Sequence, residues 1–498
     1  MTDRTKHFLT TDLIPIPKSV TINEGDFVTL EDSQELILQI PENAGSENVL
    51  NDDAFQFWKI RFAIRREALA ETIPAEGYDL EIKADKTIVL KAADLAGARF
   101  ALRTMRQLAV PERGVKQFSK FIVPPAKIVD SPDMAFRGVH ICWFPETRAF
   151  EIEKMIRLAA YYKYNYIVLE SWGVFPFESA PFLCWQDKAL DRKELKRIIT
   201  EAKELGLTII PQFNILGHAS GSRENGGKHV AINRFPEYAS LFEPDGWSFC
   251  LSNPETRKIL SACVTEMYDF FGKPGFFHIG SDEARLLATC RTCRRASRKE
   301  LVKDHFLHFH DLMAEQGARI MMWHDMLLDK EDPRWNGYIV CGSVKDGLTD
   351  LYKELPKDIV ICDWQYGYPE GEDGAAPTWA TSKFFKENGY DVLVSPCHNL
   401  KGFRSLAELA ATEPLMGVLE TTWSELDTGL FTTITKGSGI IWSGGNSERL
   451  SPKIMDAWAP DDMCMMHHHI RQIENDMGIR DYYAAGRIML QLPEKIHL

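Results

Sequence analysis

Between about residues 128 and 445, short apolar runs alternate with longer stretches of helical periodicity, and this rhythm restricts the fold more than any other feature. Strands that alternate with helices form parallel sheets, and eight of them are enough to close a barrel. The helical periodicity is clearest over 151–163, 193–204, 254–271 and 304–316. The apolar runs predict strands at 138–142, 166–170, 208–213, 275–279, 319–323, 359–363, 391–395 and 417–421. We therefore expect an α/β fold built on a (β/α)8 TIM barrel over residues 128–445.

The segments before and after this region have different patterns. Residues 78–83 and 87–91 alternate in polarity around a short polar turn, which predicts a β-hairpin. Apolar residues between Asp94 and Leu108 recur at helical spacing and predict an amphipathic helix that lies on a sheet. We expect residues 1–127 to form an α+β domain without chemistry of its own. Residues 446–498 are helical in pattern and are expected to pack on the barrel.

Charge and composition exclude several classes of partner. The chain has 71 acidic and 58 basic residues, a net charge of −13, which disfavours nucleic acid and anionic membranes and suits a small neutral substrate. The first residues lack the apolar core of an export signal, and no run is long enough to cross a bilayer. Scattered cysteines within apolar runs are typical of reduced thiols. We expect a cytoplasmic protein, or a periplasmic one if a signal has been removed; the sequence does not indicate an oligomeric state.

Two adjacent carboxylates follow the fourth predicted strand. Asp282 and Glu283 come directly after the run that ends in His278, Ile279 and Gly280. Chemistry in such barrels lies at the C-terminal ends of the strands. Neighbouring acids in different surroundings can titrate apart, as acid catalysis at an acetal requires. The alternative is that the pair only caps the next helix, because helix N-termini favour acids.

Aromatic and polar residues follow several other strands. Trp323, Trp364 and Trp423 each stand at or just after a strand end, where flat indoles can bury the apolar faces of a sugar ring. A single tryptophan is more often a core residue, but three at strand ends favour a sugar pocket. His218 follows the third strand and either contacts substrate or braces its loop. Asp325 either orients a pocket group or caps a helix.

The segment His278-x-Gly280-x-Asp282-Glu283 resembles the His-x-Gly-x-Asp-Glu motif of glycoside hydrolase family 20, the β-N-acetylhexosaminidases. Further short matches run from about residue 78 to 445, and the chain looks nearest to divergent bacterial and hexosaminidase D-like members. The resemblance implies a retaining exo-glycosidase that uses the 2-acetamido group of its substrate as the nucleophile. It implies that Glu283 is the general acid and base, and that Asp282 orients the acetamido group.

The same resemblance implies roles for further residues and requires neither a metal nor another cofactor. Tryptophans would enclose the acetamido group, and Trp423 and Glu425 match the family's Trp-x-Glu, with Glu425 bound to the C4 and C6 hydroxyls. Arg137 matches an Arg-Gly whose guanidinium binds the C3 and C4 hydroxyls; a structural ion pair is the alternative. His218 matches a Pro-Gly-His. His278 would support the acid pair by hydrogen bonding.

The sequence departs from the family pattern in three places. Residues 170–174 read Glu-Ser-Trp-Gly-Val where acids are expected, and residues 211–214 read Pro-Gln-Phe-Asn where many relatives have Pro-Glu-x-Asp. The tyrosine expected near residues 396–399 is missing, and Tyr366 is a candidate replacement. These changes leave two alternatives open: a catalytically impaired barrel that binds glycans, or a glycosidase with a different sugar specificity.

Two clusters of potential metal ligands have a less specific pattern. Cys290-x-x-Cys293, together with Cys250 and a histidine, would complete a zinc site, but one Cys-x-x-Cys is only half of the usual ligand set. His467, His468 and His469 lie in a segment with helical periodicity and are expected to form a polar helix face. We therefore predict no metal.

Overall fold

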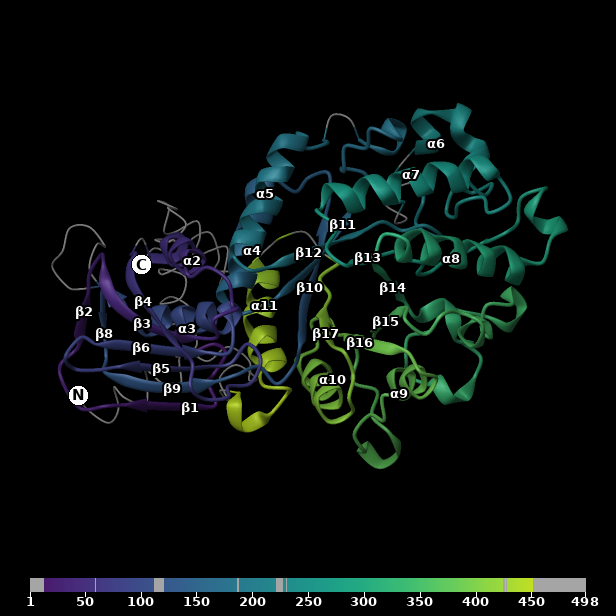
Figure 1. Ribbon diagram of the computed structural model, residues 1–498. Coiled ribbons are helices and arrows are strands. Elements are labelled where there is room, and N and C mark those ends of the chain that lie inside the picture. Colours follow the sequence, from purple (N-terminus) through teal and green to yellow (C-terminus); the bar gives the residue numbers. More distant parts are fainter. Residues whose placement is uncertain are drawn as a thin grey trace, which may run out of the picture.

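Eight parallel strands close into a barrel, as the sequence predicts. Each strand pairs with the next along the chain, and β17 returns to pair with β10, so that Gly417 lies opposite Phe136. Figure 1, a computed structural model, shows the barrel beside the N-terminal domain. The strands are β10 Phe136–Trp143, β11 Tyr166–Ser171, β12 Thr208–Gln212, β13 Phe276–His278, β14 Arg319–Trp323, β15 Val360–Trp364, β16 Asp391–Ser395 and β17 Gly417–Glu420.

The structure describes most of the chain. The described residues are 13–58, 60–111, 121–185, 188–220, 227–229, 231–423, 426 and 428–450.

Helices surround the barrel, and short polar side chains begin several of them. Asp191 accepts hydrogen bonds from the amides of Lys193 and Glu194, and Asn253 caps α7 in the same way. Ser297 caps α8, which therefore begins before the start predicted from periodicity at 304. The helices that follow the strands are α4 Ala149–Tyr161, α5 Arg192–Glu204, α6 Ala231–Arg234, α7 Pro254–Phe270, α8 Arg298–Ala314, α9 Ala380–Glu387, α10 Leu400–Thr412 and α11 Thr428–Trp442.

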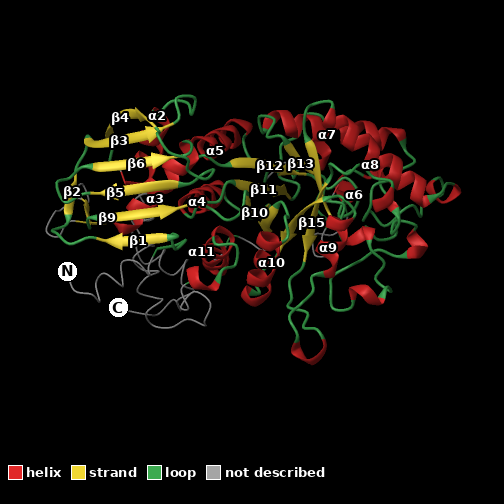
Figure 2. Cartoon of the chain, turned by 60° about the horizontal axis from the view of Figure 1, so that its bottom comes forward, coloured by secondary structure: helices red, strands yellow, loops and turns green. Residues whose placement is uncertain are grey.

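An α+β domain precedes the barrel, which confirms that part of the predicted fold. Figure 2 shows its six strands side by side in the order β1-β9-β5-β6-β3-β4. The predicted hairpin is the antiparallel pair β5 and β6, and the predicted helix is α3. The sheet strands are β1 Ser19–Ile22, β3 Gln34–Ile40, β4 Phe62–Ala68, β5 Tyr78–Ile82, β6 Ile88–Ala92 and β9 Ala126–Asp130; the helices are α2 Asn48–Trp58 and α3 Leu95–Leu108. A second, three-stranded sheet contains β2 Val28–Leu30, β7 Val110–Pro111 and β8 Phe121–Val123.

Buried charges join the two domains. Arg103 of α3 is paired with Asp53 and donates to the carbonyls of Ala160 and Leu205, at the ends of α4 and α5. Trp442, the last residue of α11, donates to Asp130 and packs edge-on against Phe100. The N-terminal domain is therefore fixed against the outer helices of the barrel.

The predicted domain boundaries lie near residues 127 and 445. β9 belongs to the N-terminal sheet and extends to Asp130, slightly beyond the predicted end of that domain at 127. The predicted helical extension over 446–498 lies outside the described residues beyond 450, as do His467, His468 and His469. The division of the chain at 127 and 445 stays a prediction.

The barrel interior is filled at its N-terminal end. Phe136 and Tyr166 stack with ring centres 4.2 Å apart and pack against Phe276, and apolar side chains from the other strands complete this layer. The packing at this end leaves the C-terminal ends of the strands as the place where a cavity can form among the described residues.

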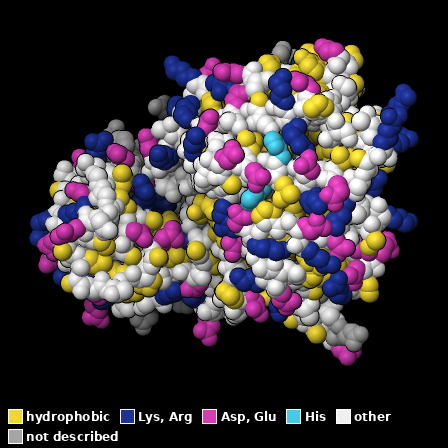
Figure 3. All heavy atoms as spheres, turned by 45° about the vertical axis from the view of Figure 1, so that its right-hand side comes forward, with side chains coloured by type: hydrophobic (Ala, Val, Ile, Leu, Met, Phe, Trp, Pro, Cys, Tyr) yellow, Lys and Arg dark blue, Asp and Glu magenta, His cyan; other side chains and the backbone are white. Residues whose placement is uncertain are grey.

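The surface carries charges of both signs. Figure 3 shows Lys and Arg side chains interspersed with Asp and Glu over the visible face. Among the described residues, no helix combines the length and apolar character that crossing a membrane requires.

Candidate active site

A cavity of about 170 Å³ lies at the C-terminal ends of the barrel strands. Its lining combines two carboxylates, a histidine and a lysine with four aromatic side chains. Its lining residues are Trp172, His218, Lys228, Asp282, Glu283, Trp364, Tyr366 and Trp423. The structure therefore brings together five residues that the sequence predicts for the site: the acid pair, His218, Trp364 and Trp423.

The backbone after β13 turns sharply to present the acid pair. Gly280, Ser281 and Glu283 all have positive φ, at 63°, 74° and 42°. A Cβ on Gly280 would lie 2.7 Å from the side-chain carbon of Asn214, so this position requires glycine for both space and conformation. Non-glycine residues with positive φ are uncommon and persist where the surrounding structure holds them. The strained turn directs both carboxylates to the cavity.

Asp282 is held as a carboxylate in a buried position. Asn214 Nδ2 donates a hydrogen bond of 2.6 Å to Oδ1, and His218 Nε2 lies 3.3 Å from Oδ2. Burial alone would raise the pKa of Asp282, but the charges of Lys228 and His218 outweigh it and lower the pKa to about 2. Asp282 is therefore ionised at neutral pH and accepts hydrogen bonds only.

Glu283 is half-buried, and its backbone is anchored on both sides. Its amide donates to Asp325 Oδ2 at 3.0 Å, and its carbonyl accepts from the indole of Trp247 at 2.8 Å. The carboxylate lies 3.5 Å from His218 Nε2, and this hydrogen bond lowers the pKa of Glu283. In the absence of substrate, Glu283 is thus ionised and paired with His218.

His218 lies between the two carboxylates. Its φ is 51°, and its ring packs on Trp247 with centres 4.5 Å apart. Burial would lower the pKa of His218, but the charge of Asp282 and hydrogen bonds with both carboxylates raise it to about 9. A protonated imidazole therefore bridges the acid pair at neutral pH, which agrees with the predicted place of His218 in the site.

Asp325 orients pocket groups rather than capping a helix. Its Oδ1 accepts from the indole of Trp364 at 3.2 Å, and its Oδ2 accepts from the amide of Glu283. Burial first, and then the charge of Asp282, raise the pKa of Asp325 to about 6. His324 occupies the cap position of the short helix that follows β14. One carboxyl group therefore fixes both a pocket wall and the backbone of Glu283.

The aromatic wall differs from the predicted one at one tryptophan. Trp423 and Trp364 line the cavity, and Trp423 donates its indole hydrogen to the hydroxyl of Tyr366. Trp323 is fully buried beneath them, with its ring 5.4 Å from that of Trp423 and 4.4 Å from that of His278. The predicted contact of Trp323 with a sugar is therefore wrong: it forms the floor that supports Trp423.

Arg137 also lies outside the cavity. It is near the N-terminal end of β10, where it is buried and paired with Glu76 at 2.6 Å. Its Nε donates to the carbonyl of Lys163, and its guanidinium lies 5.1 Å from the Trp442 ring. Phe136 points into the barrel, so the alternation of side chains along a strand turns Arg137 outward. The geometry contradicts the predicted contact with sugar hydroxyls and supports the structural ion pair.

His278 and Glu425 are the other two residues that the sequence predicts for the site. His278 Nδ1 accepts from the amide of Gly280 at 3.0 Å, and its role in supporting the acid pair stays a prediction. Burial lowers its pKa to about 3, so that it is neutral. Glu425 lies outside the described residues, and its predicted role stays a prediction.

Sequence reasoning missed a buried charge network next to Asp282. Lys228 is paired with Glu170, which also accepts from Gln212 at 2.5 Å and from the indole of Trp172 at 3.1 Å. Both charged side chains are almost fully buried, at 2% and 1% exposure. Lys228 stands in a glycine-rich loop without periodicity, so no local pattern marks it. The two amides at 212 and 214 hold the carboxylates of Glu170 and Asp282, where acids would repel them.

We expect the substitution Lys228→Met to lower the free energy of unfolding by about 3–5 kcal/mol, since it leaves the Glu170 carboxylate buried without its cation. Urea denaturation at pH 7 would measure this loss. The double substitution Lys228→Met with Glu170→Gln removes both charges and should recover much of it. Equal stability of the single and double variants would show that the pair is not coupled in this way.

Two family models match the chain, one over each domain. The first, "Glycosyl hydrolase family 20, catalytic domain", matches residues 184–427, and the second, "Glycosyl hydrolase family 20, domain 2", matches residues 10–131. Together they match most of the chain, on the barrel and on the N-terminal sheet.

Individual proteins are similar at low sequence identity. A probable beta-hexosaminidase of Arthroderma benhamiae is 22% identical over 64% of this chain, which spans 51% of the length of that relative. A beta-hexosaminidase of Vibrio furnissii is 25% identical, with 84% of this chain and 73% of the relative covered. The solved chitobiase of Flavobacterium johnsoniae superimposes with a TM-score of 0.69 at 17% identity, over 96% of this chain and 75% of that one, which shows a common fold. On the two family models, the chain belongs to glycosyl hydrolase family 20.

Proposed function

We propose that the chain is a retaining exo-β-N-acetylhexosaminidase that removes terminal N-acetylglucosamine or N-acetylgalactosamine from glycans by substrate-assisted catalysis. The observation that carries this proposal is the Asp282–Glu283 pair, whose carboxylates have different surroundings at an aromatic cavity. Asp282 is buried and ionised, whereas Glu283 is half-buried and faces open space. The reaction needs one carboxylate that stays ionised and one group that transfers a proton, and this difference assigns the first role to Asp282 and the second to Glu283.

In the first step, the acetamido oxygen of the substrate attacks the anomeric carbon as the glycosidic bond breaks. Glu283 donates a proton to the departing oxygen, and an oxazolinium ring forms on the sugar. Asp282 accepts a hydrogen bond from the acetamido N–H and stabilises the positive charge that develops there. Because Asp282 has a pKa of about 2, its charge is present without any further proton transfer.

Glu283 must carry a proton for this step, although it is ionised in the free site. Substrate that fills the cavity removes water from Glu283 and separates it from His218, and both changes raise its pKa. Without substrate, Glu283 stays paired with His218. His218 keeps its bond to Asp282, which lies 3.3 Å away.

In the second step, water attacks the anomeric carbon while the Glu283 carboxylate takes its proton. The bond between the anomeric carbon and the oxazolinium oxygen breaks, which restores the acetamido group. Two successive attacks on opposite faces leave the configuration unchanged. The reaction as proposed uses only side chains of this chain and the acetamido group of the substrate. Trp172, Trp364 and Trp423 offer flat surfaces for the sugar and its acetamido methyl. We assign Tyr366, whose hydroxyl accepts from Trp423, as the donor to the acetamido carbonyl in place of the family tyrosine.

The proposal is tested by comparing 4-nitrophenyl N-acetyl-β-glucosaminide with 4-nitrophenyl β-glucoside as substrates. We expect turnover of the N-acetyl substrate alone, because only it carries the internal nucleophile. N-acetylglucosamine thiazoline, which mimics the bicyclic intermediate, should inhibit competitively. Product configuration followed by NMR should show the β-anomer first.

Two other outcomes would each replace the proposal. Saturable binding of chitobiose or thiazoline with no turnover of either aryl substrate would indicate a glycan-binding barrel. Turnover of the β-glucoside at a similar rate would indicate a glycosidase with another specificity and a protein nucleophile.

A further inference from the structure

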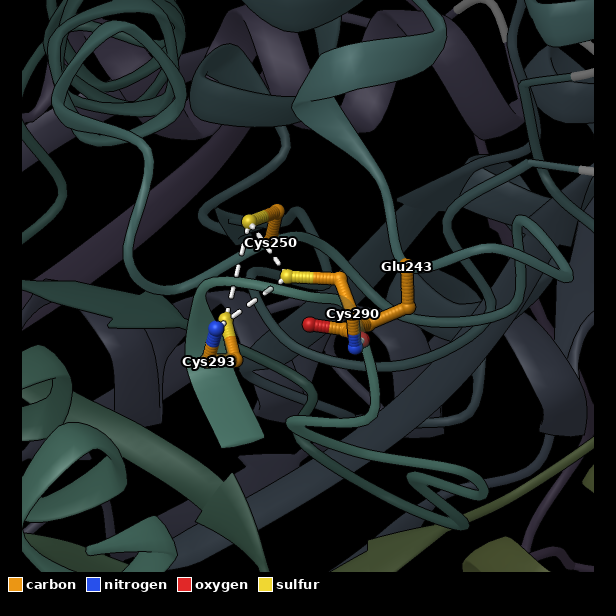
Figure 4. Close-up of side chains that lie close together, drawn as sticks. All are labelled: Glu243, Cys250, Cys290 and Cys293. Atoms are coloured by element: carbon orange, nitrogen blue, oxygen red, sulfur yellow. Dashed lines mark hydrogen bonds between the residues drawn. The ribbon is translucent and has the colours of Figure 1, made fainter. Parts of the chain in front are cut away.

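Three cysteines and a glutamate converge on one point beside the active site. Glu243 and Cys250 lie in the segment between β12 and α7, and Cys290 and Cys293 lie in the segment between β13 and α8. Their ligand atoms are all within 4.8 Å of one another, and Figure 4 shows the three sulfur atoms facing a common centre with the Glu243 carboxyl beside Cys290. The histidine that the sequence suggested as a further ligand is replaced by Glu243.

The sulfur positions match the edges of a metal tetrahedron. Cys250 Sγ lies 3.7 Å from Cys290 Sγ and 3.6 Å from Cys293 Sγ. Ligands at the Zn–S distance of about 2.3 Å, in tetrahedral directions, are about 3.8 Å apart. A disulfide requires about 2.05 Å, and one disulfide would leave the third thiol unused. The spacing therefore suits a shared metal better than a covalent bond.

Glu243 provides a second and independent sign of a cation. Its side chain is 1% exposed, and Oε2 accepts from the amides of Thr289 and Cys290, at 2.7 and 2.6 Å. Oε1 is buried and has no hydrogen-bond partner among the described residues. A buried carboxylate oxygen without a partner is costly, and a metal ion at the centre of the cluster would satisfy it.

The backbone around Cys290 is already shaped for a metal thiolate. The amide of Cys293 donates to Cys290 Sγ at 3.3 Å, within the tight Cys-x-x-Cys turn. Such N–H···S bonds stabilise the negative thiolate, which is the form that binds metal. The cluster thus has both its ligands and the groups that orient them.

We propose that Glu243, Cys250, Cys290 and Cys293 bind one Zn²⁺ ion in a structural site. Three thiolates with one carboxylate select a soft divalent metal over Mg²⁺ or Ca²⁺, which prefer oxygen ligands. Four protein ligands fill a tetrahedral shell and leave no position for a substrate or water, so the metal has no part in the chemistry.

The zinc site fixes the two loops that hold the acid pair. Trp247, between Glu243 and Cys250, donates to the carbonyl of Glu283 and packs on His218. Ser248 donates to the carbonyl of Arg285 at 3.0 Å. Both contacts connect the loop that carries Glu243 and Cys250 with the loop that carries the catalytic acid. Removal of zinc is therefore expected to loosen Glu283 and His218 together.

The first experiment measures metal in the wild-type chain, purified under reducing conditions and supplied with ZnCl₂. We expect one zinc per chain by elemental mass spectrometry. Replacement by Co²⁺ should give a thiolate-to-metal charge-transfer band and the intense visible bands of tetrahedral cobalt. Removal of zinc by a chelator should lower the Tm, and ZnCl₂, but not MgCl₂, should restore it. None of these readouts depends on glycosidase activity.

Substitutions then assign the ligands. Cys250→Ser should abolish stoichiometric zinc, and Glu243→Gln should weaken zinc binding at least about 10-fold, the smallest loss expected even for an outer-shell partner. Cys263→Ser, which changes a buried cysteine outside the cluster, should retain one zinc. A wild-type chain that binds no zinc, zinc that survives Cys250→Ser, or a native disulfide between cluster cysteines would overturn the proposal. Should a variant fail to fold, the cobalt spectrum of the wild type decides alone.

Discussion

The substitution Glu283→Gln is expected to lower kcat/KM by about 10²- to 10⁴-fold on N-acetyl-chitobiose, which is the usual contribution of a general acid. The sugar leaving group of chitobiose is basic and needs a proton as the bond breaks, and an amide cannot supply one. A 4-nitrophenolate leaves without that help, so the aryl substrate should lose far less in the bond-breaking step. Steady-state kinetics on the two substrates, measured with the same enzyme preparation, gives the comparison.

The conservative change keeps the size of the side chain, so the loss should not come from misfolding. Glu237→Gln, at an exposed position in the segment between β12 and α7, is the matched control and should behave as wild type. In the Glu283→Gln variant, the pH profile of kcat/KM should also lose the step that is due to the titration of Glu283. Equal losses on both substrates would contradict the role of acid, and would instead assign Glu283 a role in binding or orientation.

The barrel could be predicted from sequence because its strands are buried on both sides. All eight residues of β10 are buried, and such strands appear as continuous apolar runs in the sequence. The fourth strand of the barrel, β13, is shorter than predicted: it covers 276–278 rather than 275–279, and positive φ angles begin at Gly280 in the turn that presents the acid pair. The spacing of apolar residues predicts strands, but it does not reveal a strained turn at a functional site.

The site was predictable where position along a strand determines function. Asp282, Glu283 and His218 all follow strand ends, and the closed barrel brings these ends to one mouth. The predicted sugar contacts of Arg137 and Trp323 were wrong, because the direction of a side chain and its depth in the barrel decide what it touches. One points outward from β10, and the other lies below the cavity.

The remaining residues could not be predicted because their roles depend on long-range contacts. Lys228 meets Glu170 across 58 positions of sequence, and both are buried beside Asp282. The neutral amides of Gln212 and Asn214 looked like losses, but each donates to a buried carboxylate. A lysine in one loop and two amides at and just after the end of β12 thus form one network that only the tertiary structure reveals.

The substitution Asp282→Asn is expected to lower kcat on the N-acetyl substrate by about 10²- to 10³-fold, as expected when one preorganised charge at a developing ion is removed. Unlike the change at Glu283, the loss should be similar for good and poor leaving groups, since it affects the acetamido nucleophile. Inhibition by the thiazoline should weaken in parallel. Kinetics on both substrates and the thiazoline inhibition constant measure these effects.

The same variant has a readout that is separate from catalysis. The pKa of His218 is raised from 6.5 to about 9, chiefly by Asp282, against the opposing effect of burial. A raised histidine pKa stabilises the fold fully below pH 6.5, and this stabilisation is lost as the pH rises through about 9. NMR titration of Asp282→Asn should therefore show a lower His218 pKa, and its stability should fall less between pH 6.5 and 9. Asp304→Asn, an exposed acid on α8, should change neither property. If Asp282→Asn retained full activity and the high His218 pKa, Asp282 could neither orient the acetamido group nor hold the imidazolium, and the division of roles within the acid pair would fail.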